Sequence, residues 1–199
     1  MKNLLKKFAL MLCFCIGTIL INPVIEAKAM VNEDTTNEVI LYEDTEKTVI
    51  AIVNDNQKDS YINDILTNPE FKQEELNKTN LNLRLPAGQI MSQKFMYKSD
   101  IQRTVDKYAG YGTFAKALSN PVTDATVAYL LKKAKFSNPW TFAATVLTWS
   151  IGDLMNRQQS WWNESLLQIL QNKIRCVRVT HIRNTTSNYP AAYLIIERI

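Results

Sequence analysis

The N-terminus most constrains how this chain can fold. Three lysines within the first seven residues precede an uncharged apolar run from Phe8 to Ile21, and Ala27-Lys28-Ala29 follows with small residues at its first and third positions. A basic start, an apolar run and a small-x-small pattern, in that order, are typical of a secretory signal peptide. The sequence therefore predicts export, with residues 1–29 removed by cleavage after Ala29.

Two other interpretations of this N-terminal segment stay open. An uncleaved membrane anchor is the first, although the 14-residue run is shorter than the roughly 20 residues that span a bilayer. A lipoprotein is the second, because Cys13 and Cys15 lie within the run. Neither cysteine follows a small residue, as a lipid-acceptor cysteine does, so the signal peptide is the interpretation we carry forward.

Cysteine usage limits what can hold the exported chain together. Removal of residues 1–29 leaves 170 residues, enough for one ordinary domain or two small ones, with Cys176 as the only cysteine. A single cysteine cannot form an internal disulfide. The fold must therefore be held by its core, by a partner or by a membrane. The lack of cysteine pairs, together with many Asn and Lys residues, favours an exported protein of a Gram-positive bacterium.

Charge is divided unevenly along the exported chain. Residues 30–78 carry 12 acidic and 4 basic residues, a net −8, whereas residues 79–199 carry 15 basic and 6 acidic residues, a net +9. Such an asymmetry suggests separate roles for the two parts. We predict an acidic leader-like segment at 30–78, a linker at 79–98 and a basic helical domain at 99–199, with the acidic segment masking the basic part. The alternative is that both are ordinary surfaces of one domain.

Hydrophobic periodicity predicts the elements of an α+β fold. Two short β-prone runs, the second rich in β-branched residues, predict strands at 39–42 and 48–53. Alternation with period two predicts strands at 174–183 and 191–199. Helical spacing and helix-start residues predict two short helices at 59–66 and 69–78, and longer helices at 99–118, 122–136, 139–156 and 160–172. We expect an N-terminal acidic hairpin, a cluster of the four longer helices around the third of them, and a C-terminal β-hairpin.

The third of these longer helices is unusual because no charged residue lies between Phe136 and Gly152. All four tryptophans fall within 23 residues around it, and basic residues flank it. Tryptophan, lysine and arginine are the side chains that favour a membrane interface. The candidate membrane contacts are Trp140, Trp149, Trp161, Trp162, Lys132, Lys133, Lys135 and Arg157. The alternative is a buried central helix in which the tryptophans are large core residues.

The exported part offers little chemistry. His181 and Cys176 are its only histidine and cysteine, and their separation of five residues on a predicted strand places them on opposite faces. The sequence has no phosphate-binding loop, nucleophile elbow or HExxH motif, so we predict no enzymatic activity, cofactor or metal. Carboxylates could serve a cell-wall hydrolase as acid and base, although helix caps and solvated surfaces are their more ordinary roles. They are Asp100, Asp106, Asp124, Asp153 and Glu164.

This layout resembles that of the larger unmodified bacteriocins of Gram-positive bacteria. A secretory signal, a short acidic segment and a basic, tryptophan-rich helical part carry the resemblance across residues 30–199. It implies a secreted antibacterial protein that acts on the anionic membrane of related bacteria, with any receptor or immunity protein unknown. Export makes nucleic acid an unexpected partner. A soluble extracellular interaction module without enzymatic activity and a cell-wall hydrolase stay open as alternative functions.

Overall fold

The computed structural model describes residues 36–80, 89–148, 158–187 and 189–199. These residues form five β-strands and seven α-helices, which confirms the predicted α+β class. They belong to one compact unit that extends from Thr35 to Ile199. The predicted signal peptide and its cleavage site lie outside the described residues.

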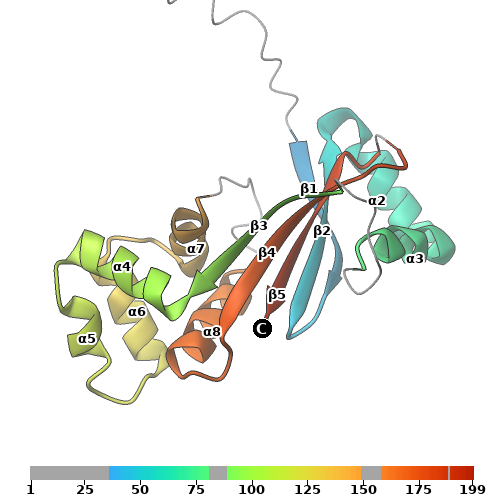
Figure 1. Ribbon diagram of the computed structural model, residues 1–199. Helices are drawn as coiled ribbons and strands as arrows, with labels where there is room; N and C mark the ends of the chain where they lie inside the picture. Colours follow the sequence, from blue (N-terminus) through green and yellow to red (C-terminus); the bar gives the residue numbers. More distant parts are fainter. Residues whose placement is uncertain (1–35, 81–88, 149–157, 188) are drawn as a thin grey trace, which may run out of the picture. The chain divides into compact units, whose positions relative to one another are not determined.

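One antiparallel sheet contains all five strands in the order β1-β2-β5-β4-β3 (Figure 1). The strands are β1 (Thr36–Glu43), β2 (Lys47–Asn54), β3 (Ile90–Tyr97), β4 (Cys176–Arg183) and β5 (Ala192–Arg198). Both predicted hairpins are confirmed as β1–β2 and β4–β5. Pairing of β2 with β5 joins the two hairpins, so the first and last of the described strands share one sheet.

In the described part of the chain, two α-helices precede β3 and five lie between β3 and β4. A short 3-10 turn, η2 (Asp55–Gln57), leads into α2 (Lys58–Thr67) and α3 (Pro69–Lys78). The later helices are α4 (Lys98–Ala109), α5 (Thr113–Ala117), α6 (Asp124–Lys133), α7 (Pro139–Leu147) and α8 (Gln159–Leu170). Asn68 and Asn138 cap α3 and α7, each with a proline at the first helical position. The sequence predicts the two prolines and the Asn138 cap.

The two faces of the sheet carry separate hydrophobic cores, because successive side chains on a strand point to opposite faces. On β5, Leu194 and Ile196 pack with helices α4–α8 in the larger core. Their neighbours Tyr193 and Ile195 pack with α2 and the side chain of Phe71 from α3 in the smaller core. All four β5 side chains are buried. Strand β5 is therefore central to both cores.

Residues 90–97 form strand β3, where the sequence predicts part of a linker. Met96 is the only fully buried side chain of this strand, so its pattern shows little of the alternation that marks a half-buried strand. The pairing of Lys94 with Val179 and of Met96 with Val177 on β4 supplies the stabilisation that the local sequence does not reveal. The remainder of the predicted linker includes residues 81–88, which lie outside the described residues.

The predicted helix 99–118 is two helices, α4 and α5, separated at Gly110 and Gly112. Both glycines have positive φ, 105° and 80°, a conformation that an α-helix cannot continue through. Helix α4 also begins one residue earlier than predicted, because the backbone N–H of Tyr97 donates to Asp100 Oδ2 at 2.9 Å. The third predicted helix, α7, ends at Leu147, and the residues expected to extend it fall largely outside the described part.

Candidate functional site: a lysine-rimmed groove on the helical side

Three of the four tryptophans expected at a membrane interface are buried. Trp140, Trp161 and Trp162 are 3 %, 6 % and 0 % exposed. Trp162 lies at the centre, with its ring centroid 5.4 Å from that of Trp140 and 5.2 Å from that of Trp161. Both contacts are edge-on, the geometry that aromatic quadrupoles favour. In this fold the three tryptophans are core residues; Trp149 and Arg157 lie outside the described residues.

A buried arginine from the sheet holds Trp161 in place. The guanidinium carbon of Arg198 lies 4.6 Å from the Trp161 ring centroid, within the range of a cation–π contact. The same guanidinium donates to the Trp161 carbonyl and to Ser165 Oγ, both at 2.9 Å. Arg198 also lies 3.3 Å from the carboxylate of Glu164. This network ties α8 to β5, so Trp161 cannot turn to the surface without breaking it.

The predicted lysines, in contrast, are exposed. Lys132 and Lys133 form the last turn of α6, where positive charge interacts favourably with the helix dipole. Lys135 follows in a left-handed conformation with φ 62°, which turns the chain out of α6. The Phe136 N–H then bonds the Leu131 carbonyl at 2.9 Å, a bond that closes the helix end. The chain thereby places three exposed lysines within four positions, just before the start of α7.

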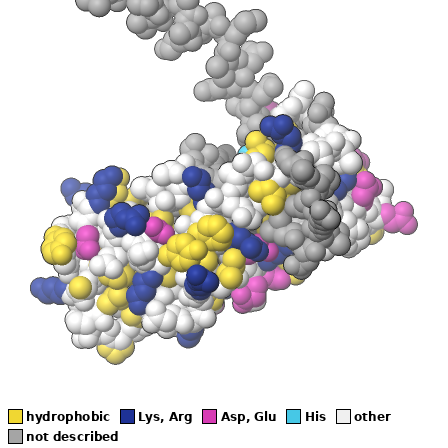
Figure 2. Space-filling view, viewed as in Figure 1, with side chains coloured by type: hydrophobic (Ala, Val, Ile, Leu, Met, Phe, Trp, Pro, Cys, Tyr) yellow, Lys and Arg dark blue, Asp and Glu magenta, His cyan; other side chains and the backbone are white. Residues whose placement is uncertain are grey.

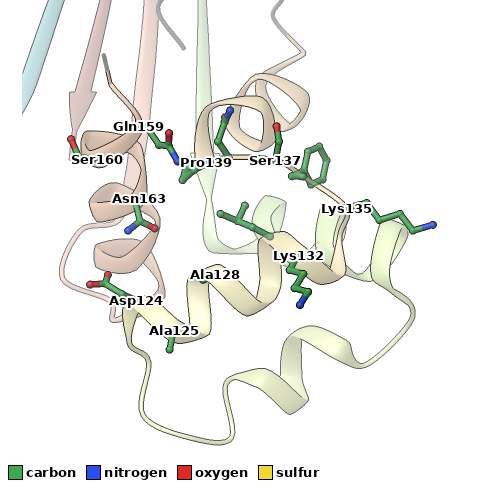
Figure 3. A pocket seen from close by; sticks show the side chains of 13 residues that line it. Asp124, Ala125, Ala128, Lys132, Lys135, Ser137, Pro139, Gln159, Ser160 and Asn163 are labelled. Atoms are coloured by element: carbon green, nitrogen blue, oxygen red, sulfur yellow. The ribbon is translucent and has the colours of Figure 1, made fainter. Parts of the chain in front are cut away.

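A groove of about 1140 Å³ lies beside these lysines, between α6 and the first turns of α7 and α8 (Figure 3). Leu131, Phe136 and Pro139 provide apolar surface within it. Its remaining lining residues are Asp124, Ala125, Ala128, Lys132, Lys135, Ser137, Asn138, Gln159, Ser160 and Asn163. A concave surface of this kind, partly apolar with several polar groups, is the usual form of a ligand-binding site.

The two ends of the groove differ in charge. Lys132 and Lys135 lie at the end formed by the junction of α6 and α7, whereas Asp124 lies at the opposite end of α6 beside Asn163 of α8 (Figure 3). The Asn138 side chain is occupied as a helix cap, since its Oδ1 accepts the Thr141 N–H at 2.8 Å. The basic end is thus the part of the groove that suits an anionic group, and no histidine or cysteine is among its described lining residues.

Exposed tyrosines adjoin the lysines. The ring of Tyr108 packs edge-on against Phe136 with centroids 5.4 Å apart, and Lys107 Nζ lies 5.1 Å from the centre of the Tyr108 ring. Tyr129 lies three and four residues before Lys132 and Lys133 on α6, and therefore on the same stripe of that helix. We call these six residues the lysine–tyrosine surface: Lys107, Tyr108, Tyr129, Lys132, Lys133 and Lys135. Basic side chains are spread over this helical part of the molecule (Figure 2).

Most candidate carboxylates have structural partners. Asp106 Oδ1 accepts the Phe114 N–H at 3.3 Å across the α4–α5 turn, and Asp100 lies 3.1 Å from Arg103. Burial raises the pKa of the Cys176 thiol, which lowers its reactivity near neutral pH. Within the described ranges, no cluster of three His, Cys, Asp or Glu residues could hold a metal ion. Asp153 lies outside those ranges.

Comparison with protein-family models gives no match, and neither the curated proteins nor the solved structures give a significant one. In the part of the chain that the structure describes, no helix has both the length and the apolar character to span a bilayer. The lysines of the site were found from the sequence through their position beside an uncharged segment. The groove itself was not found, because its walls come from α6 and α8, which are separated by more than twenty residues in the chain.

Proposed function

We propose that this protein is exported and acts as an antibacterial protein that attaches to the anionic membrane of bacteria through its lysine–tyrosine surface. One observation carries the proposal. Four exposed lysines and two exposed tyrosines are grouped at the end of α4, on α6 and in the turn after α6. Lysine is attracted by anionic headgroups, and tyrosine combines an apolar ring with a polar tip that suits the interface.

The charges are numerous enough for useful binding. Each basic residue near an anionic membrane surface contributes about 1 kcal/mol at physiological salt, so the three lysines at the end of α6 together contribute about 3 kcal/mol. A contribution of 1.4 kcal/mol changes an equilibrium constant tenfold. The tryptophans have a different role in this proposal, because three of them are buried. They stabilise the helices that present the lysines.

Vesicle binding tests the proposal. The protein should be residues 30–199, which contain the whole compact unit but not the apolar N-terminal run, since that run would bind lipid by itself. We expect co-sedimentation with vesicles rich in phosphatidylglycerol and little with phosphatidylcholine. Replacement of Lys132, Lys133 and Lys135 by Glu should lower the partition coefficient at least about 100-fold. Equal binding by wild type and this variant would contradict the proposal.

A matched control uses a lysine on the other side of the sheet. Lys72 of α3 is exposed and belongs to the acidic N-terminal part of the unit. Its counterpart is the single variant Lys133→Glu, which should weaken vesicle binding at least about fivefold. Lys72→Glu changes the net charge by the same amount, yet it should leave vesicle binding almost unchanged. Release of a trapped dye from the same vesicles, and killing of Gram-positive cells, would separate membrane damage from attachment alone.

A soluble extracellular interaction module is a second candidate, favoured by the groove between α6 and α8. The burial of three tryptophans and the mixture of apolar, basic and amide side chains along the open groove suit a ligand that binds in solution. Ala128 is exposed within the groove, and Ala128→Trp would fill part of it. This variant would abolish binding of a soluble ligand but leave vesicle binding intact. A cell-wall hydrolase has no observation in its favour among the described residues.

A further inference from the structure

The turn between α4 and α5 presents one aromatic ring entirely to solvent. Tyr111 is 101 % exposed, the highest value among the large hydrophobic residues that the structure describes. Gly110 and Gly112 flank it with φ angles of 105° and 80°. A Cβ atom at Gly112 would meet nothing within 4 Å, so backbone conformation, rather than a shortage of space, favours glycine there. Because both flanking residues are glycines, the Tyr111 ring projects from the turn with no side chain immediately before or after it.

A fully exposed tyrosine ring does not contribute to the stability of the fold. Buried aromatic rings stabilise a protein through the area they remove from water, and Tyr111 removes none. Tyr108, one turn earlier on α4, is half-exposed and packs against Phe136. The ring of Tyr111 therefore lies at the tip of a turn whose preceding helix ends in the lysine–tyrosine surface.

The charges around this tip favour an anionic partner. Lys107 belongs to the last turn of α4 and Lys116 to the last turn of α5, and both are exposed. The one acidic residue between Arg103 and Lys116 is Asp106, whose Oδ1 accepts the backbone N–H of Phe114. A fully exposed phenol with lysines on both sides matches the interface of an anionic bilayer, where the ring meets acyl chains and the lysines meet phosphates.

We propose that Tyr111 is the membrane anchor of this protein: it enters the headgroup region of an anionic bilayer while the lysine–tyrosine surface binds the lipid phosphates. This inference rests on the proposed function and adds the residue that enters the interface between the headgroups and the acyl chains. It also explains the two glycines, since side chains there would change the turn that directs the ring outward. The lysines attract the protein to the bilayer surface, and Tyr111 slows its dissociation from the bilayer.

The first test compares Tyr111→Ser with Tyr42→Ser in residues 30–199. Tyr42 is an exposed tyrosine on β1, 42 % accessible, outside the lysine–tyrosine surface. Tyr111→Ser should lower partitioning into phosphatidylglycerol vesicles about tenfold, because binding scales with the apolar area that leaves water. Tyr42→Ser should bind as wild type does. Tyr111→Ser should unfold at the wild-type temperature, so its loss of binding cannot be ascribed to loss of the fold. Tyr42→Ser loses the hydrogen bond from its hydroxyl to Asp44 Oδ2 and should unfold at a somewhat lower temperature, yet still bind.

The second test places a reporter at the tip. Tyr111→Trp in a Trp149→Phe background should fluoresce and be quenched by lipids that carry bromine on their acyl chains, whereas Tyr42→Trp in the same background should not be quenched. Two results would show that Tyr111 is not the anchor while leaving the proposed function intact. One is that Tyr111→Trp binds vesicles without being quenched. The other is that Tyr111→Ser binds as tightly as wild type while the lysine variants bind weakly. If wild type itself does not bind, both are wrong.

Discussion

The hydrophobic cores on the two faces of the sheet are stabilised by different interactions. On one side, α4–α8 bury three tryptophans and many aliphatic side chains against the strands. On the other, α2 and α3 build a smaller core around Tyr61 and Tyr193, whose hydroxyl groups both donate to the buried carboxylate of Glu75, at 2.7 Å and 2.9 Å. Lys78 pairs with the other oxygen of that carboxylate at 2.7 Å. One core depends mainly on packing area, the other also on a polar network.

This difference shows that the charge division of the sequence does not divide the fold. The acidic part supplies β1 and β2 to the sheet, and β2 pairs with β5 of the basic part over six residue pairs from Lys47 to Ile52. Ile50 of β2 packs in the core of the helical side, although its immediate neighbours Val49 and Ala51 pack on the other side. The acidic residues are therefore attached to a structural part of the same unit, which favours the single-domain alternative over a removable mask.

The largest expected effect is that of removing the acidic part. Residues 79–199 alone lack β2, so β5 loses one of its two partner strands and both cores lose side chains. We expect this fragment to be insoluble or to show no cooperative thermal transition, whereas residues 30–199 unfold cooperatively. Circular dichroism against temperature makes the comparison. A folded 79–199 fragment with native near-UV signal would restore the leader-like role of residues 30–78.

Truncation of the central tryptophan should be the most damaging single change on the helical side. Trp162→Ala removes a side chain that is 0 % exposed and touches two other tryptophans, and replacements of this kind lower the free energy of unfolding by about 3–5 kcal/mol. Tyr129→Ala, on the exposed face of α6, should change it by less than about 0.5 kcal/mol. Urea denaturation measures both. A cost for Trp162→Ala near that of Tyr129→Ala would mean that Trp162 is not a core residue.

On the opposite side, the polar network gives a smaller but specific effect. Glu75→Ala leaves the buried hydroxyls of Tyr61 and Tyr193 without their acceptor, and we expect a loss of about 2–3 kcal/mol in the free energy of unfolding. Glu75→Gln keeps an acceptor oxygen and should lose less. The control is Glu74→Gln, because the Glu74 side chain is 67 % exposed and pairs only with Lys78 in the described structure. Equal stability of Glu75→Ala and Glu74→Gln would show that the network contributes nothing.

The same network predicts a pH dependence confined to the α2–α3 side. Burial, with the nearby Glu75 carboxylate, raises the pKa of both Tyr61 and Tyr193 well above the ordinary value of about 10. The folded state thus keeps these protons at pH values where the unfolded chain loses them. This contribution is fully present below about pH 10 and is lost as pH rises further. The urea midpoint of Tyr61→Phe should therefore fall less steeply above pH 10 than that of wild type.

Local patterns in the sequence were enough for the hairpins and for the helix starts. The β-branched residues along 48–53 predicted β2, and Asn138-Pro139 predicted where α7 begins, because capping and strand propensity are local properties. Strand β3 could not be predicted, since seven of its eight side chains are exposed or half-buried and only its pairing with β4 identifies it.

The candidate site was harder to predict from the sequence than the fold, for a physical reason. An apolar helix flanked by tryptophans has the same sequence pattern in a protein core and at a membrane interface, and only its packing distinguishes the two. The deciding contact is the Arg198 guanidinium over Trp161, made by residues 37 positions apart on different elements. The lysines could be predicted because exposure is the ordinary state of lysine. The polar network of Glu75 and Tyr193, 118 positions apart, gave no signal in the sequence.

The central claim is that the tryptophans stabilise the fold while lysines and tyrosines meet the membrane. Tryptophan fluorescence of residues 30–199 carrying Trp149→Phe tests this directly, because Trp140, Trp161 and Trp162 are then the only emitters. On binding to phosphatidylglycerol vesicles with brominated acyl chains, the emission should keep the wavelength and intensity of the free protein. Strong quenching on binding would contradict the account, because it would place those buried tryptophans in lipid.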